Sequence, residues 1–248
     1  MINIYLTIAL SVVMGFSVFL SLPIVFHRKT GRKKLLFYNA IAIGILVFLL
    51  MDMYGDVAAD FGSTIITNPM ELVFLLGFAA AFLFFIMPRS SRDPSENPKR
   101  TSILAAVGIG FQNLTEGLVF GSAGAAGLVS IYTIAAIGFI LQNITEGFPI
   151  AVPLIGSKEK IKKRFVSGAF LIGGMPTIIG TLIGLVFYSK MFIVFFDAIA
   201  GAAILYIVLV LFHVNINKGI EEKNEKVVWL TYFGILIGFA IAFIVNYM

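Results

Sequence analysis

The sequence contains no cysteine, which excludes disulfide bonds, zinc–thiolate sites and thiol catalysis. It has two histidines, His27 in a basic segment and His213 near the end of an apolar run, and neither has a partner at the spacing of a metal site or an activated nucleophile. No lysine lies deep in an apolar run, which excludes a buried Schiff base of the retinal kind. We therefore expect no enzymatic activity and no organic cofactor.

Charge is also scarce. Charged residues make up 12% of the chain, hydrophobic residues 59%, and the mean hydropathy is +1.00. A soluble domain carries about twice that charged fraction. Apolar runs of about 20 residues are typical of membrane-spanning helices rather than of a barrel. The first residues, Met1 to Ile4, lack the basic segment of a cleaved signal peptide, so we expect the first span to be retained.

The pattern predicts an all-α integral membrane protein with one transmembrane domain over residues 1–248. The eight predicted helices cover about residues 3–26, 35–55, 69–87, 102–122, 128–153, 166–188, 192–213 and 228–247. Residues 88–101, which contain three prolines, are predicted to form a flexible cytoplasmic linker.

The connections between these segments alternate sharply in charge. Every lysine and arginine except Lys190 lies in an odd-numbered connection. The positive-inside rule then predicts that these connections are cytoplasmic and that both termini lie outside. We expect the protein to reside in the plasma membrane. Topology thus accounts for the formal charge of +5, and we expect the lipid bilayer, not nucleic acid, as the partner.

Acidic residues gather on the predicted outer side. Asp56 and Asp60 lie in the second connection, Asp197 lies near the start of the seventh segment, and Asp52 lies one helical turn before Asp56. Two interpretations remain open. The acids are simply tolerated outside, or they form an entrance that concentrates cations, with Asp52 at its bottom.

One hexapeptide occurs twice, thirty residues apart, in the fourth and fifth apolar segments. It reads Gln-Asn-Leu-Thr-Glu-Gly at 112–117 and Gln-Asn-Ile-Thr-Glu-Gly at 142–147. On a helix the Gln, Asn and Glu of each copy share one face. A carboxylate inside a membrane costs at least ~2.5–3.5 kcal/mol, and this chain carries that cost twice. We predict an intramembrane cation site formed by Gln112, Asn113, Glu116, Gln142, Asn143 and Glu146.

A structural alternative is that the Gln and Asn amides form hydrogen bonds between helices and that the glutamates are protonated. All of these side chains would then serve only to hold the helices together. It does not explain why two carboxylates occur in register. Because the fourth and fifth segments run in opposite directions, a two-fold axis in the membrane plane would bring the copies together. Pro149, Pro153 and Pro176 are predicted to interrupt the fifth and sixth segments beside a cavity.

The repeated hexapeptide resembles the paired motifs of the ZIP (Zrt/Irt-like) divalent-metal transporters, whose fourth helix carries His-Asn-x-Pro-Glu-Gly and whose fifth carries a similar version. The resemblance extends to the eight spans, the outside termini and the Pro-rich linker. It implies inverted repeats of spans one to three and six to eight around the two motif helices, a 3+2+3 arrangement. It also implies import of zinc, iron, manganese or related ions, as a homodimer.

This chain departs from the family pattern at several positions. Gln112 stands where the first motif has histidine, Thr115 and Thr145 stand where the motifs have proline, and Met175 stands where a glutamate often precedes the proline of the sixth span. We therefore expect one ion rather than two, held mainly by the two glutamates. Oxygen ligands favour iron(II), manganese or magnesium more than a histidine-rich site does, zinc remains a candidate, and Met175 would add a soft contact if it reached the ion.

Two other functions remain open from the sequence. One is a structural or signalling membrane protein that kept this fold without transport. The other is a proton-coupled carrier of a small organic solute.

Overall fold

The computed structural model describes residues 4–26, 31–61, 69–86, 97–126, 129–155, 157, 161–221 and 225–246. Within these ranges all regular structure is helical, and eight helices are long and apolar enough to cross a membrane. For these residues the predicted all-α class and the predicted number of long apolar helices are confirmed.

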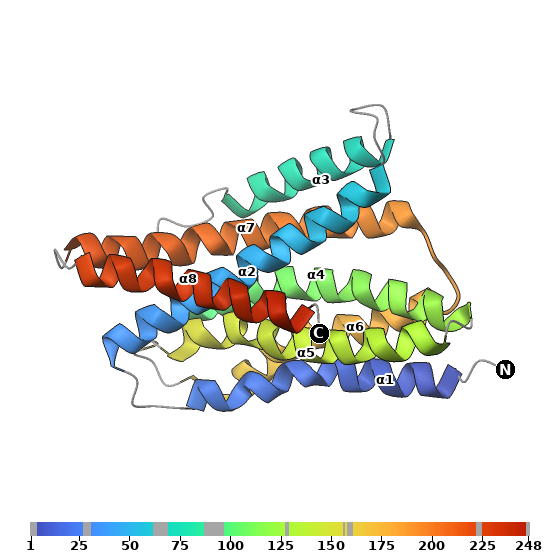
Figure 1. Cartoon of the computed structure of the whole chain (residues 1–248), viewed down its shortest axis with the longest axis horizontal. Helices are drawn as coiled ribbons and strands as arrows, with labels where there is room; N and C mark the ends of the chain where they lie inside the picture. The colour runs from blue at the N-terminus through green and yellow to red at the C-terminus, as the bar shows by residue number, and fades with distance from the viewer. Residues whose placement is uncertain are drawn as a thin grey trace.

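The helices run up and down, so the odd-numbered connections meet at one end of the bundle and the even-numbered ones at the other (Figure 1). Several extend beyond their apolar runs. The elements are α1 (Ile4–Ser17), continued by the 3₁₀ helix η1 (Val18–Phe26), α2 (Arg32–Phe61), α3 (Pro69–Ile86), α4 (Pro98–Ala125), α5 (Val129–Ile155), α6 (Lys163–Gly184), α7 (Lys190–Glu221) and α8 (Glu225–Asn246).

The start of α4 corrects the predicted linker. Pro98 occupies the first turn, where its missing N–H costs nothing, and the Asn97 side chain accepts a hydrogen bond from the Arg100 backbone N–H at 3.1 Å. Residues 98–101 are therefore helical, and residues 88–96 lie outside the described ranges. The predicted interruptions were also wrong, because α5 continues through Pro149 and Pro153 and α6 continues through Pro176.

The helix α4 lies at the centre and packs against α5, α6 and α7. The helix α2 packs against α7 and α8, whereas α3 packs mainly on α7 at the edge of the bundle (Figure 1). The main buried core joins α2, α4, α5, α6 and α7. The two helices that carry the repeated hexapeptide thus pack against most of the others, which buries most of their polar side chains.

Glycines bring the backbones of α4 and α6 into direct contact. A Cβ atom added to Gly180 would overlap the carbonyl oxygen of Leu114, and one added to Gly117 would overlap that of Thr177. Small residues of this kind allow close approach of membrane helices. The second half of the first hexapeptide is therefore held firmly against α6.

We expect Gly180→Ala to lower the stability of the protein by about 1–3 kcal/mol, because the added methyl group must push the α4 backbone away. Thermal unfolding in detergent measures this. The matched control is Gly168→Ala on the same helix, where an added Cβ meets nothing within 4 Å. Equal unfolding temperatures for the two variants would contradict the close packing.

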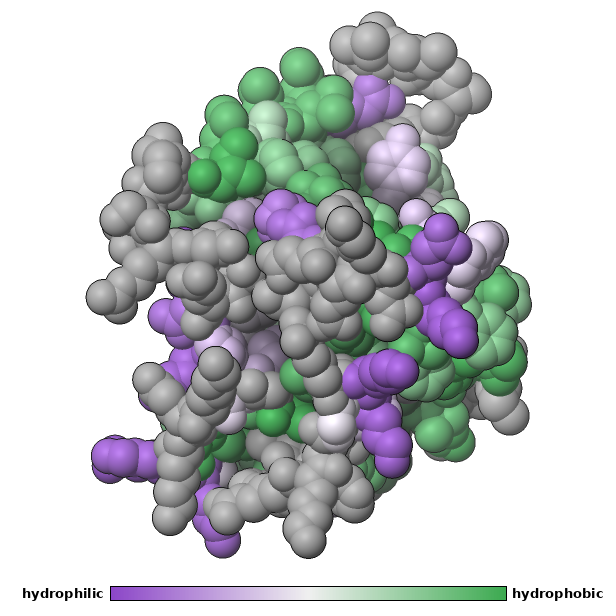
Figure 2. All heavy atoms as spheres, turned by 90° about the vertical axis from the view of Figure 1, so that its left-hand side faces the viewer, coloured by the Kyte–Doolittle hydropathy of each residue, from purple (hydrophilic) through white to green (hydrophobic). Residues whose placement is uncertain are grey.

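The end of the bundle that holds the odd-numbered connections is here called the basic end. Hydrophilic residues stand out on it among apolar ones (Figure 2). The described basic residues in and beside these connections are Lys33, Lys34, Lys99, Arg100, Lys162, Lys163, Arg164 and Lys226. The alternation of charge seen in the sequence is therefore an alternation between the two ends of the fold.

Candidate functional site

The two copies of the hexapeptide meet inside the bundle. The Gln142 Nε2 atom of α5 donates to Glu116 Oε1 of α4 at 2.7 Å and to Glu146 Oε1 of its own helix at 3.0 Å. Gln112 Nε2 donates to the same oxygen of Glu116 at 3.2 Å. One amide therefore lies between the two carboxylates, and the predicted meeting of the two glutamates is present in the structure.

The two asparagines hydrogen-bond to the backbone of neighbouring helices. Asn113 Nδ2 donates to the Gly173 carbonyl of α6 at 2.9 Å, and Asn143 Nδ2 donates to the Met14 carbonyl of α1 at 2.8 Å. Both side chains are fully buried. Their N–H groups therefore anchor the motif helices to α6 and α1, and only their oxygens remain for a ligand.

The hydroxyl groups of the two motif threonines form further hydrogen bonds, which a proline side chain cannot form. Thr115 Oγ1 and Thr145 Oγ1 donate to the carbonyls of Gln112 and Gln142 at 2.7 Å each. The Thr115 hydroxyl also lies 2.7 Å from Asp197 Oδ1 of α7. Thr115 thus links α4 to α7 beside the site, a role that its place in the motif did not indicate.

Many oxygens of the two copies have no hydrogen-bond partner although they are buried. They are Gln112 Oε1, Asn113 Oδ1, Glu116 Oε2, Asn143 Oδ1 and Glu146 Oε2. Each unpaired buried acceptor costs about 1–3 kcal/mol, so such groups are rare without a ligand, ion or water. All five are acceptors, which a cation satisfies and an anion does not.

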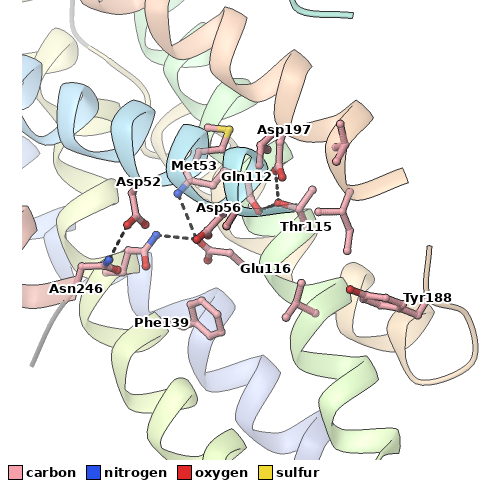
Figure 3. A pocket seen from close by; sticks show the side chains of 16 residues that line it. Asp52, Met53, Asp56, Gln112, Thr115, Glu116, Phe139, Tyr188, Asp197 and Asn246 are labelled. Carbon is pink, nitrogen blue, oxygen red and sulfur yellow. Dashed lines mark hydrogen bonds between the residues drawn. The ribbon is translucent and has the colours of Figure 1, made fainter. Parts of the chain in front are cut away.

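A cavity of about 520 Å³ opens at the end opposite the basic end, and two of the residues that carry these oxygens, Gln112 and Glu116, line it. Gln112 and Glu116 line it together with Asp52, Asp56 and Asp197 (Figure 3). Gln142 of α5 lines it as well. Asp52 is half-buried and accepts a hydrogen bond from Asn246 Nδ2 of α8 at 3.0 Å. Glu146, Asn113 and Asn143 are fully buried and do not line the cavity.

The three predicted entrance residues lie in different environments. Asp56 is exposed at the mouth of the cavity, and Asp52 lies deeper. Asp197 also lines the cavity, but it is only 5% exposed and is bonded to Thr115, so it belongs to the wall of the cavity and not to its mouth. The physical reason is that α7 begins at Lys190, which puts Asp197 two turns inside the bundle. The side chain of Asp60 lies outside the described part of the structure.

Met175 does not reach the site. Its side chain is 38% exposed and does not line the cavity. On α6 the buried positions Gly173 and Thr177 face α4 and its neighbours, and a residue two positions from each points to the opposite side of the helix. Sequence reasoning also missed Asn246, which stands out as a polar residue within an apolar run.

The chemistry available is that of two carboxylates and several amide oxygens. Among the described residues no group of three or more His, Cys, Asp and Glu side chains is placed to hold a metal ion. A site here would therefore use two carboxylates, amide oxygens and water, which are the ligands of hard divalent ions. No family model matches this chain, and no curated protein matches it significantly.

Because Asp56 is exposed and Asp197 is not, we expect Asp56→Asn alone to weaken capture of a cation. The half-saturation concentration for uptake should rise about two- to threefold at low ionic strength and return to the parental value at high salt, since the steering field of an exposed charge is screened. Initial uptake rates at several salt concentrations measure this. Glu225→Gln, at the basic end, is the control and should have no effect.

Proposed function

We propose that this protein transports a divalent metal cation through a membrane, with the two hexapeptide copies as its intramembrane binding site. The observation that carries the proposal is the set of unpaired buried acceptor oxygens on α4 and α5. Two carboxylates neutralise a divalent ion, and the resulting neutral site is far less costly in a low-dielectric interior than two separate charges.

The ligand set supports one ion rather than two. A second divalent ion would need further negative charge, and Met175, the position at which the resembled family often has glutamate, lies outside the cavity. Oxygen ligands without imidazole or thiolate favour manganese(II), iron(II) or magnesium, with zinc as a weaker candidate. The Gln142 amide, which lies between the carboxylates, would have to turn aside when the ion enters.

The contacts of the two copies support inverted repeats of spans one to three and six to eight. In each copy the asparagine donates to a carbonyl of a neighbouring helix, and the glycine four residues later packs against the carbonyl one turn further along that helix. The pairs are Asn113 with Gly173 and Gly117 with Thr177, and Asn143 with Met14 and Gly147 with Val18. The α4–α6 contact therefore has a counterpart in the contact of α5 with α1 and η1, as a two-fold relation requires.

Membership of the ZIP family is part of the same proposal and rests on the motif, the eight helices and this pairing. With the basic end on the cytoplasmic side, the 520 Å³ cavity opens outward, and the protein is in an outward-facing state suited to import. Ile109, Ile150 and Ile207 belong to the buried core, and in this proposal that core closes the path toward the basic end.

The test is the thermal stability of the purified protein across a panel of magnesium, manganese, iron(II) and zinc. An ion at 100 times its dissociation constant should stabilise the folded state by about 2.7 kcal/mol. Uptake of the stabilising ion into proteoliposomes then separates transport from binding. Without stabilisation by any ion, a structural protein or an organic-solute carrier becomes the better account, and stabilisation without uptake indicates a fold that binds but does not transport.

A further inference from the structure

The amide of Gln142 lies where a cation shared by the two carboxylates would lie. Its Nε2 atom donates to Glu116 Oε1 at 2.7 Å and to Glu146 Oε1 at 3.0 Å. A side-chain amide nitrogen carries two hydrogens, so both are used, and a hydrogen bond to a carboxylate is stronger than one between neutral groups. The amide and an ion therefore compete for the same two oxygens.

Gln112, the matching residue of the first copy, is placed differently. Its Nε2 atom donates to Glu116 Oε1 of its own helix at 3.2 Å, and its Oε1 atom is buried without a hydrogen-bond partner. The side-chain oxygens of Asn113 and Asn143 are in the same condition, whereas the oxygen of Gln142 is not. Three of the four motif amides thus have an oxygen available for a cation, and Gln142 instead directs its hydrogens at the carboxylates.

Gln142 also has space in which its amide can turn. It lines the 520 Å³ cavity, whereas Glu146, to which it is bonded, is fully buried and does not line it. An ion in the cavity therefore cannot contact Glu146 until a side chain moves. Because Gln142 borders the cavity and contacts Glu146, rotation of its amide into the cavity frees the oxygens of both glutamates at once.

Two carboxylates need other partners when no ion is bound. Two negative charges without a cation are costly in a low-dielectric interior, and a transporter has to return its empty site after it releases each ion. The two N–H groups of Gln142 lower that cost, since each satisfies an oxygen that the ion has left. The bond from Gln142 to Glu116 also keeps α5 joined to α4 in the empty state.

We propose that the Gln142 amide is a stand-in for the cation, which bridges the two carboxylates while the site is empty and so allows the empty site to return for the next ion. The inference rests on the transport function above and adds how its site is emptied and refilled. The two glutamates bind the ion, whereas Gln142 is a positioning residue that competes with it. The amide leaves when an ion enters and returns when the ion leaves.

The test compares net uptake with exchange in proteoliposomes of Gln142→Leu, which has no side-chain N–H group. The probe is manganese(II), or another ion of the panel if only that ion binds. Net uptake requires the empty site to return, whereas exchange of labelled ion outside for unlabelled ion inside does not. The ratio of net uptake to exchange should fall about tenfold, equivalent to about 1.4 kcal/mol in the barrier to return of the empty site.

The affinity of the same variant gives a second readout. Calorimetric titration of Gln142→Leu should give a dissociation constant no higher than that of the parent, because no hydrogen bond of the amide has to break when the ion enters. Gln112→Leu is the matched control, since it removes the corresponding amide and an unpaired acceptor oxygen. It should weaken binding and should lower net uptake and exchange by the same factor.

The control's result in Gln142→Leu would mean that Gln142 is a ligand or a packing residue, and it would overturn the proposal, as would an unchanged ratio. Gln142→Met, which keeps the length of the side chain without an N–H group, replaces Gln142→Leu if that variant does not fold, and the same outcomes decide. A parent that takes up the ion but does not exchange it overturns the return of an empty site and leaves transport standing. A parent that neither binds nor takes up any ion of the panel overturns the transport function itself.

Discussion

Glu116→Gln and Glu146→Gln are each expected to reduce cation uptake by about a hundredfold or more, equivalent to about 2.8 kcal/mol of lost binding. Each substitution keeps the size of the side chain and removes one of the two negative charges that face each other across Gln142. The remaining single carboxylate cannot neutralise a divalent ion in a buried site, so binding and transport fail together.

Folding should survive in both variants. An amide in place of Glu146 can still accept the hydrogen bond from Gln142, and removal of a buried charge relieves the ion-free protein. The measurements are metal-ion uptake in proteoliposomes and thermal unfolding without added metal. Glu225→Gln, on the exposed first turn of α8, is the control. Parental uptake by both folded variants would place the transport site elsewhere.

Gln112→His is expected to move selectivity toward zinc, by about tenfold or more in the zinc-to-manganese ratio, equivalent to about 1.4 kcal/mol. Gln112 lines the cavity, its Nε2 atom lies 3.2 Å from Glu116 Oε1, and its own Oε1 is buried without a partner. Imidazole nitrogen suits zinc, whereas an amide oxygen discriminates little among divalent ions beyond size and charge.

Imidazole must be neutral to bind a metal, so the zinc affinity of this variant should fall at low pH more steeply than that of the parent. Competitive titration with zinc and manganese at several pH values measures both effects. Ser122→His, on the same helix but outside the cavity, is the matched control and should leave the ratio unchanged. An unchanged ratio in Gln112→His would mean that residue 112 does not touch the ion.

The number and type of helices could be predicted because each span requires its own long apolar run. Their ends could not, since α2 and α7 extend well past the apolar residues and α4 begins at a proline capped by Asn97. The prediction that prolines interrupt two of the helices was wrong for a related reason. A proline weakens a helix locally, but packing against neighbouring helices can keep it continuous, and α5 and α6 continue through Pro149, Pro153 and Pro176.

The meeting of Glu116 and Glu146 through Gln142 could be predicted from sequence alone. Each copy places its polar side chains on one face of an otherwise apolar helix, and two such faces on adjacent antiparallel helices are best buried against each other. Which other side chains join them does not follow. Asp197 is buried against Thr115 and Met175 points away because of crossing geometry between helices far apart in the chain. Periodicity within one helix determines a face, whereas only packing of all the helices decides what that face meets.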